Sequence, residues 1–315
     1  MPNQLYPILF MLSSTFSLSI SGLLSKSLAN QLDANLFGFL RFLLPALLIL
    51  LMLCVRGVRK PSAEMLKPMW IRALCIAACQ LCFIFSLKHL TLVESVVLFG
   101  TGPLFIPVLE RLFFAEPIKW VTVACLIVTF SGVVMLSGGV GNIEFRPELF
   151  IGLAAGLFNA GSQISLYRAS KSQLNALEIN FWTFFYASIL LFPVMAVSLY
   201  VSDSAFNLQF VQAEVNNPIL LVVMLATLSL LVINTQVFRS KAYKLVSSSS
   251  QLAPLIFTNL LFTALWQWLF FSDPFTHHQL LGLALIVLAN VLNMLIPQWP
   301  NIRKMFEQYQ HRTSH

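Results

Sequence analysis

Few side chains in this sequence could carry chemistry, and the most conspicuous are two ionisable residues inside long apolar segments, Arg41 and Glu94. If these segments cross a bilayer, each buried charge costs about 2.5 to 3.5 kcal/mol, so such residues normally pair or serve a function. Two interpretations stay open. The residues form a structural ion pair, or they form a gate or solute site in which Glu94 takes up a proton or a cationic group and Arg41 holds a carboxylate.

A second feature is a cluster of helix-breaking residues in the middle of an apolar segment. Gly100, Gly102 and Pro103 lie together, and proline removes a backbone donor and clashes with the preceding turn. The pattern predicts a kinked or unwound helix. Such a break at bilayer depth either lines a cavity or forms a packing notch. Pro254 invites the same interpretation in a later segment.

Polar and aromatic side chains share helix faces in three other segments. Ser14, Ser17, Ser21 and Ser25 form a stripe that suits close helix packing better than a solute path. The comparable face of a later segment carries Gly152, Gly156, Asn159 and Gln163, and its two amides suggest contact with a ligand. Trp182 and Tyr186, one helical turn apart, are candidates for a cavity wall.

No set of residues indicates an enzyme, a metal site or a bound cofactor. The sequence has no nucleophile with its base, no phosphate-binding glycine loop and no pair of acids. Cys75, Cys79 and Cys82 share a predicted helix face, but no histidine or carboxylate lies on a neighbouring predicted turn to complete a metal site.

Composition places these residues in a membrane. The 315 residues are 58% hydrophobic and only 10% charged, with a mean hydropathy of +0.81. Segments of about 20 apolar residues recur throughout, and each must be helical because lipid offers the backbone no hydrogen-bond partner. The sequence therefore predicts an all-α membrane protein with ten spans: 6–24, 35–55, 70–88, 92–114, 119–137, 148–168, 178–200, 218–238, 247–271 and 278–297.

The basic residues indicate orientation, not nucleic-acid binding, although the net charge is +7. Fifteen Lys and Arg fall in the even-numbered connections and the C-terminal tail: Arg56, Arg59, Lys60, Lys67, Arg72, Arg111, Lys119, Arg168, Lys171, Arg239, Lys241, Lys244, Arg303, Lys304 and Arg312. The odd-numbered connections hold three: Lys26, Lys88 and Arg146. This asymmetry predicts cytoplasmic termini in an inner membrane.

The chain also repeats itself. Residues 112–117 (LFFAEP) return at 269–274 (LFFSDP), and 30–34 match 172–176. Each half has five predicted spans, an odd number, so the second half enters the membrane inverted. We therefore predict modules at 1–140 and 147–297 and a cytoplasmic tail at 298–315. In the second half, Thr183 occupies the position equivalent to Arg41, and Gln251 occupies the position equivalent to Glu94. Both charges are absent there, so the fold itself requires neither.

The order of these features resembles a known family. Lys26, Arg41, the run from Gly100 to Pro103, Glu116 and Gly132 resemble one EamA-type module of the drug/metabolite transporter superfamily. Residues 251–255, 271–274 and 282–286 resemble a second. The resemblance implies a transporter of small, amino-acid-like or drug-like solutes.

The sequence thus predicts a secondary transporter that moves a small metabolite through the lipid bilayer by alternating access, with proton coupling or exchange. A non-transporting membrane scaffold or assembly protein is the alternative. Arg41 is the only cation well inside a predicted span, which argues against a phosphate-bearing substrate.

Overall fold

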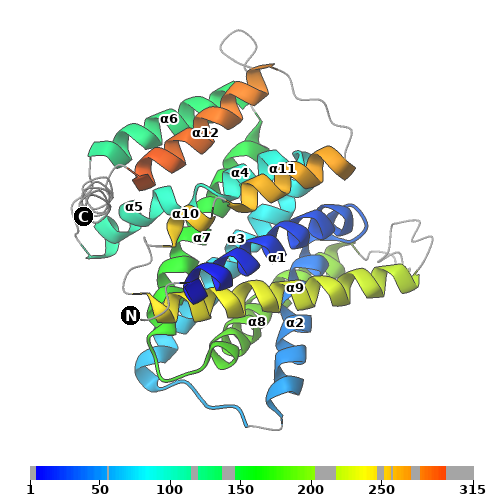
Figure 1. Ribbon diagram of the computed structural model, residues 1–315. Coiled ribbons are helices and arrows are strands. Elements are labelled where there is room, and N and C mark those ends of the chain that lie inside the picture. The colour runs from blue at the N-terminus through cyan, green and yellow to red at the C-terminus, as the bar shows by residue number, and fades with distance from the viewer. Residues whose placement is uncertain are drawn as a thin grey trace, which may run out of the picture. The chain divides into compact units, whose positions relative to one another are not determined.

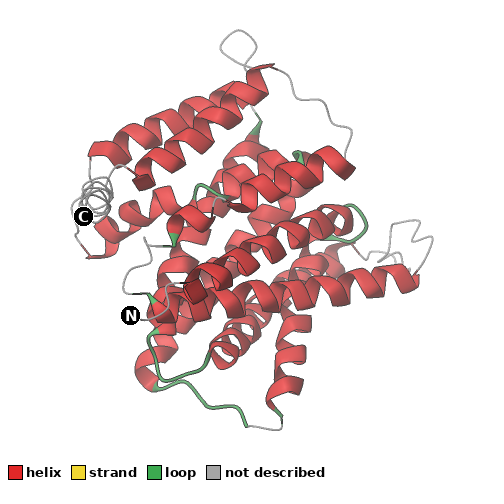
Figure 2. Ribbon diagram, viewed as in Figure 1, coloured by secondary structure: helices red, strands yellow, loops and turns green. Residues whose placement is uncertain are grey.

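In the computed structural model, the described part of the chain is built from helices and their connections (Figures 1 and 2); it comprises residues 5–54, 57–114, 120–136, 146–202, 218–246, 252–256, 258–270 and 277–295. The helices are α1 (Leu5–Ala29), α2 (Ala34–Leu53), α3 (Ala63–His89), α4 (Leu92–Phe99), α5 (Gly102–Phe114), α6 (Trp120–Leu136), α7 (Pro147–Ser170), α8 (Ala176–Ser202), α9 (Pro218–Leu245), α10 (Ala253–Ile256), α11 (Thr258–Phe270) and α12 (His277–Leu295). Six of them, α1, α2, α3, α7, α8 and α9, are long and apolar enough to cross a membrane. The all-helical prediction is confirmed.

Matching sequence in the two halves produces matching helix caps. The Asp33 carboxylate accepts hydrogen bonds from the N–H groups of Asn35 and Leu36 at the start of α2, at 2.9 and 3.0 Å. At the equivalent place before α8, the Asn175 side chain accepts from the Glu178 N–H at 2.9 Å, and the Glu178 carboxylate accepts from the Asn175 N–H at 2.8 Å. Both caps satisfy backbone donors that a helix start leaves open. The repeat therefore extends to local structure.

The predicted break in the fourth span is confirmed. The Thr101 N–H and hydroxyl both donate to the Leu98 carbonyl, at 3.2 and 2.6 Å, and close the turn that separates α4 from α5. Pro103 is the second residue of α5, where a missing N–H costs no hydrogen bond. Pro254 lies in the short α10, and the break predicted there stays a prediction because residue 257, between α10 and α11, lies outside the described residues.

The helices form two compact units that differ from the two sequence halves. The first unit comprises Met1–Gly102 and Arg146–Pro274, and the second comprises Pro103–Phe145 and Phe275–His315. Each unit combines helices from both halves of the repeat. The boundaries at 1–140, 147–297 and 298–315 remain a prediction about the sequence repeat, and the tail at 298–315 lies outside the described residues.

Packing within the first unit pairs the helices of one half with those of the other. In the repeat, α1 of the first half is equivalent to α7 of the second, and α3 is equivalent to α9. α3 packs against α7 and α1 packs against α9, so the two contacts are equivalent to each other. The mates α2 and α8 also pack together, with Phe39 6.0 Å from Phe192 and Phe42 5.9 Å from Phe184 between ring centroids. The earlier residue of α2, Phe39, meets the later residue of α8, Phe192, so α2 and α8 are antiparallel.

The second unit holds another antiparallel pair of mates, α6 and α12. Gly132 fits because it lacks a side chain: a Cβ there would lie 2.8 Å from the Gly282 carbonyl and 2.7 Å from Ile286. Farther along the pair, Cys125 and Ala289 are buried together with Leu104 of α5. Small residues thus allow these two helices to approach closely.

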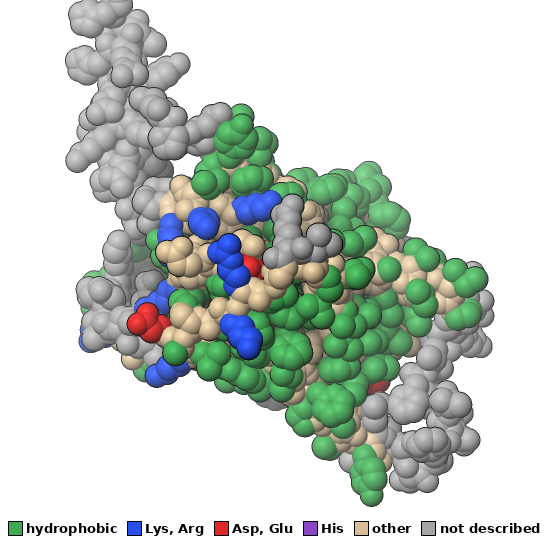
Figure 3. Space-filling view, turned by 90° about the horizontal axis from the view of Figure 1, so that it is seen from below, with side chains coloured by type: hydrophobic (Ala, Val, Ile, Leu, Met, Phe, Trp, Pro, Cys, Tyr) green, Lys and Arg blue, Asp and Glu red, His purple; other side chains and the backbone are tan. Residues whose placement is uncertain are grey.

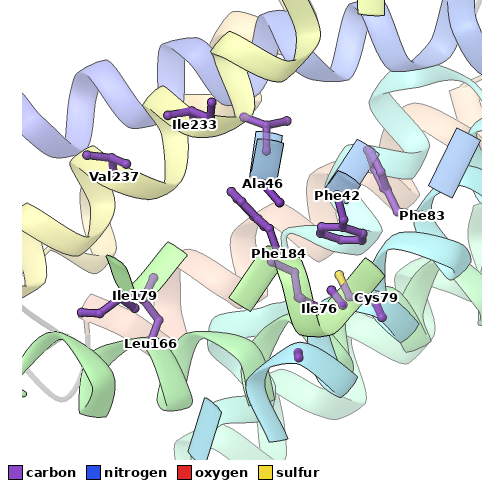
Figure 4. Close-up of a cluster of buried hydrophobic side chains, with 14 of the residues drawn as sticks. Phe42, Ala46, Ile76, Cys79, Phe83, Leu166, Ile179, Phe184, Ile233 and Val237 are labelled. Atoms are coloured by element: carbon purple, nitrogen blue, oxygen red, sulfur yellow. The ribbon is translucent and has the colours of Figure 1, made fainter. Parts of the chain in front are cut away.

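Apolar side chains fill the centre of the first unit, and basic ones gather on one face. Figure 4 shows part of the core, including Phe42, Ile76 and Phe184. Figure 3 shows a face on which Lys and Arg side chains gather beside hydrophobic ones. The exposed basic residues of the first unit lie near the ends of α7 and α9 and the start of α3: Arg59, Lys60, Lys67, Arg168, Lys171, Lys241 and Lys244.

Candidate substrate site

A cavity with apolar and polar side chains in its wall lies inside the first unit, surrounded by helices from both halves of the chain. Its volume is about 60 Å³, well above the roughly 10 to 15 Å³ that one water molecule requires. The strongly polar side chains in its wall are Arg41, Gln80, Asn159, Gln163, Gln236, Arg239 and Asn259. No Asp or Glu of the described residues lines it. The cavity can therefore surround a small polar group with amides and positive charge.

Three of the predicted site residues meet in this wall. Arg41 reaches it from α2, and Asn159 and Gln163 reach it from α7. Gln163 donates to the Asn159 side-chain oxygen at 3.2 Å and accepts a hydrogen bond from the Tyr243 hydroxyl, also at 3.2 Å. These contacts fix both amides in the wall. Their role toward a solute remains a prediction.

Of the two interpretations of Arg41 and Glu94, the structural ion pair is wrong, and the gate or solute site stays a prediction. Arg41 donates to the Ser25 hydroxyl and forms no ion pair within the described part of the chain. Glu94 instead accepts from the Thr91 N–H at 2.9 Å, completing a capping box at the start of α4, and its carboxylate lies 3.8 Å from Arg146. Thr91 stands three residues before Glu94, which is the spacing of that motif. The cap holds Glu94 at the helix start.

The break between α4 and α5 adjoins the cavity. Phe99, the last residue of α4, lines the wall. A Cβ on Gly102 would lie 2.9 Å from the Asn159 side-chain nitrogen, so the backbone just past the break touches a wall residue. Gly100 itself faces its own preceding turn and Leu260. The side chain of Pro103 lies outside the described residues.

Trp182 and Tyr186 do not line this cavity, so their place in a cavity wall stays a prediction. The Trp182 indole donates to the Arg59 carbonyl at 2.9 Å, and Tyr186 stacks on Trp70 with ring centroids 4.5 Å apart. This face of α8 turns toward the start of α3 and the segment before it. Gln251 and the side chain of Pro254 lie outside the described residues.

The structure adds two buried cations that sequence analysis assigned to basic connections. Arg72 on α3 is 0% exposed, and Arg239 on α9 is 2% exposed and lines the cavity. Arg41 is therefore not the only cation inside a helix. The expectation failed because α3 begins earlier and α9 ends later than hydropathy suggests. One signal was available: Thr235 and Gln236, one turn before Arg239, continue a polar face of the same helix.

Comparison with known proteins identifies the family. The sequence profile of the EamA-like transporter family matches residues 5–138 and 146–295. The chain belongs to this family. It is accordingly a multi-pass membrane protein of a transporter family, not an enzyme, and its partner is a small-molecule substrate. The resemblance drawn from the two modules is confirmed.

Individual relatives of this EamA-like transporter are distant. The pseudopaline exporter CntI of Pseudomonas aeruginosa is 25% identical over 282 residues, in strain UCBPP-PA14 and in strain PAO1, covering 90% of this chain and 93% of the exporter. A solved crystal structure of a protein is similar with a TM-score of 0.52 at 16% identity, covering 93% of this chain and 95% of that one. This second likeness concerns the fold alone.

Proposed function

We propose that this protein is a secondary transporter that moves a small metabolite across the inner membrane by alternating access. The observation that carries the proposal is the cavity whose wall combines Arg41 of the first half with Gln163 and Arg239 of the second. Transporters built from inverted repeats hold their solute between the repeats and alternate by rocking one against the other. A cavity shared by both halves is suited to that mechanism.

The helix arrangement supports ten spans in two inverted five-helix repeats. In this interpretation α4 with α5 forms one divided span, and α10 with α11 belongs to the predicted span at 247–271. The mates α2 and α8 run antiparallel, as do α6 and α12. Mates related by a twofold axis in the membrane plane must run in opposite directions. The excess of Lys and Arg in the even-numbered connections favours cytoplasmic termini.

The relatives favour export as the direction of transport, because CntI of Pseudomonas aeruginosa is an exporter. The solute is of the amino-acid-like class, and its transport is driven by proton coupling or by exchange. These finer features follow from relatedness and from the polar wall, and each is open to direct measurement.

Counterflow in proteoliposomes tests the proposal. Vesicles that contain the purified protein and are loaded with one unlabelled metabolite should take up the same labelled metabolite transiently above its equilibrium level. Gln163→Ala should weaken this uptake, whereas Gln173→Ala, which alters an exposed amide just after α7, should leave it unchanged. A protein that exchanges no member of a broad metabolite panel would support a scaffold instead.

A further inference from the structure

Two buried arginines in the first unit carry charges that no described residue balances with an ion pair. Arg72 and Arg239 form no ion pair within the described part of the chain. They lie close enough for their positive charges to repel each other. A charge removed from water without a partner is strongly destabilising. Such an arrangement persists where a function requires it.

The unpartnered atoms of Arg239 have the geometry of an oxyanion site. Its Nε and Nη2 groups are buried and have no hydrogen-bond partner among the described protein groups. These two N–H groups lie on one edge of the guanidinium and point the same way. That edge is the fork that binds a carboxylate through two parallel hydrogen bonds. Arg239 also lines the cavity, so this unpartnered fork belongs to a side chain that borders the space available to a solute.

Arg72 is held in place as a second cation beside this site. Its Nη2 donates to the Asn180 oxygen at 2.9 Å and to the Gln236 oxygen at 3.4 Å. Asn180 is itself oriented, because its nitrogen donates to the Ala176 carbonyl at 2.8 Å and to the Ser240 hydroxyl at 3.1 Å. The oxygen of Asn180 therefore faces Arg72. The Nε and Nη1 groups of Arg72 remain without a hydrogen-bond partner among the described groups.

The rest of the cavity wall, as far as the described residues form it, contributes further positive charge and no carboxylate. Arg41 adds another guanidinium, and the other strongly polar lining groups are neutral amides. A low-dielectric cavity lined by one sign of charge concentrates ligands of the opposite sign. A cationic drug would meet repulsion here without a compensating carboxylate.

We infer that the solute of this transporter carries net negative charge and binds through a carboxylate-type oxyanion to Arg239, with Arg72 as the supporting cation. The inference rests on the proposed transport function and specifies its substrate class. It also narrows the expectation of amino-acid-like or drug-like solutes to those in which anionic groups outnumber cationic ones.

Thermal unfolding of the purified protein in detergent tests the inference without requiring transport. The probes are succinate, glutarate and inorganic phosphate, with succinamide and glutaramide as neutral counterparts. We expect the carboxylates to raise the melting temperature in a saturable manner and their neutral counterparts to leave it unchanged. A larger effect of phosphate than of succinate would identify a tetrahedral oxyanion and overturn the carboxylate assignment. Equal effects of charged and neutral probes, or no effect of any probe, would overturn the anion site.

Variants locate the site. Arg239→Gln should raise the half-saturating concentration of the stabilising carboxylate about ten- to a hundredfold, the equivalent of one charge-assisted hydrogen bond. Arg239→Lys, which keeps the charge but loses the fork, should lie between Arg239→Gln and the wild type. Arg168→Gln, which alters an exposed arginine on α7, serves as the matched control and should bind like the wild type. Undiminished stabilisation of Arg239→Gln would remove Arg239 from the site.

A second measurement separates a functional arginine from a structural one. Without any probe, Arg239→Gln should melt at the same temperature as the wild type or higher, because it removes a buried and unbalanced charge. A clear decrease would indicate a structural arginine and count against the inference. Probe-dependent stabilisation without counterflow would leave the anion site standing and refute transport. Counterflow of neutral or cationic solutes alone would support transport and refute the anion site.

Discussion

Lys26 and Lys171 cap the C-terminal ends of two equivalent helices, α3 in the first half of the chain and α9 in the second. Lys26, near the end of α1, donates to the Leu87 carbonyl of α3 at 2.6 Å and to the Leu90 carbonyl just beyond it. Lys171, just after α7, donates to the Val246 carbonyl at 2.6 Å, just beyond α9. A cation at a helix C-terminus satisfies open carbonyls and complements the helix dipole. In both halves of the repeat, a lysine at the end of the first helix thus hydrogen-bonds to the C-terminal end of the third.

Replacing either lysine should destabilise the protein. We expect Lys26→Met to lower the free energy of unfolding by about 1 to 2 kcal/mol, because charge-assisted hydrogen bonds to open carbonyls are lost. Lys171→Met should cost less, since Lys171 is exposed and Lys26 is half-buried. The check is thermal melting in detergent, with exposed Lys60→Met as the control. A Lys26 variant that melts like the control would contradict a capping role.

Gly156 should tolerate no side chain. A Cβ there would lie 2.7 Å from the Leu98 carbonyl, a backbone atom beside the helix break, and would also overlap the Thr101 hydroxyl. Gly156→Ala should therefore cost about 1 to 3 kcal/mol, as expected for overpacking. Gly22→Ala is the matched control, because its Cβ would make ordinary contacts at 3.8 and 3.9 Å with Leu92 and Val96. Equal melting temperatures for the two variants would show that α4 and α7 can separate without cost.

Glu94 should act in structure and not in coupling. Glu94→Gln keeps an acceptor for the Thr91 N–H but loses the charge that faces Arg146, so we expect a modest loss of stability, about 1 kcal/mol. The pH dependence of transport should persist in the variant. Flux measured across a pH series decides the matter, with exposed Glu64→Gln, in the first turn of α3, as control. Loss of pH dependence in Glu94→Gln alone would restore the gate hypothesis.

Pro103→Ala should reduce transport more than stability. Pro103 occupies the first turn of α5, where its missing N–H is not needed, so the exchange should change stability by less than about 1 kcal/mol. Alanine would, however, allow α4 and α5 to join into one continuous helix. Parallel melting and counterflow assays provide the measurement. Equal losses in both assays would make the break a packing feature.

Both termini should face the cytoplasm. Reporter fusions after Lys60 and after Lys304 should report the cytoplasm, and a fusion at Gln209 should report the exterior. The cation asymmetry between the two sets of connections is the physical reason. Lys304 and Gln209 lie outside the described residues, so the reporters test the sequence directly. A cytoplasmic signal at Gln209 would contradict both the ten spans and the inversion.

Local sequence was sufficient wherever one segment carries the whole cause. Apolar runs of membrane-crossing length predicted helices, because a backbone in lipid must satisfy its own hydrogen bonds. The glycines and the proline at 100–103 predicted the break between α4 and α5, because these residues act on their own turn. The repeated phrase and the ordered modules predicted the family. None of these conclusions depends on which helices become neighbours.

Tertiary structure decided which side chains meet. An ion pair of Arg41 and Glu94 was one interpretation of the sequence, yet Glu94 caps the start of its own helix and Arg41 contacts Ser25. Arg72 and Arg239 were counted with the basic connections, but packing of α3, α8 and α9 buries both. Hydropathy averages a segment and cannot show the direction in which one arginine points. The positive cavity exists only because helices from both halves of the chain enclose it.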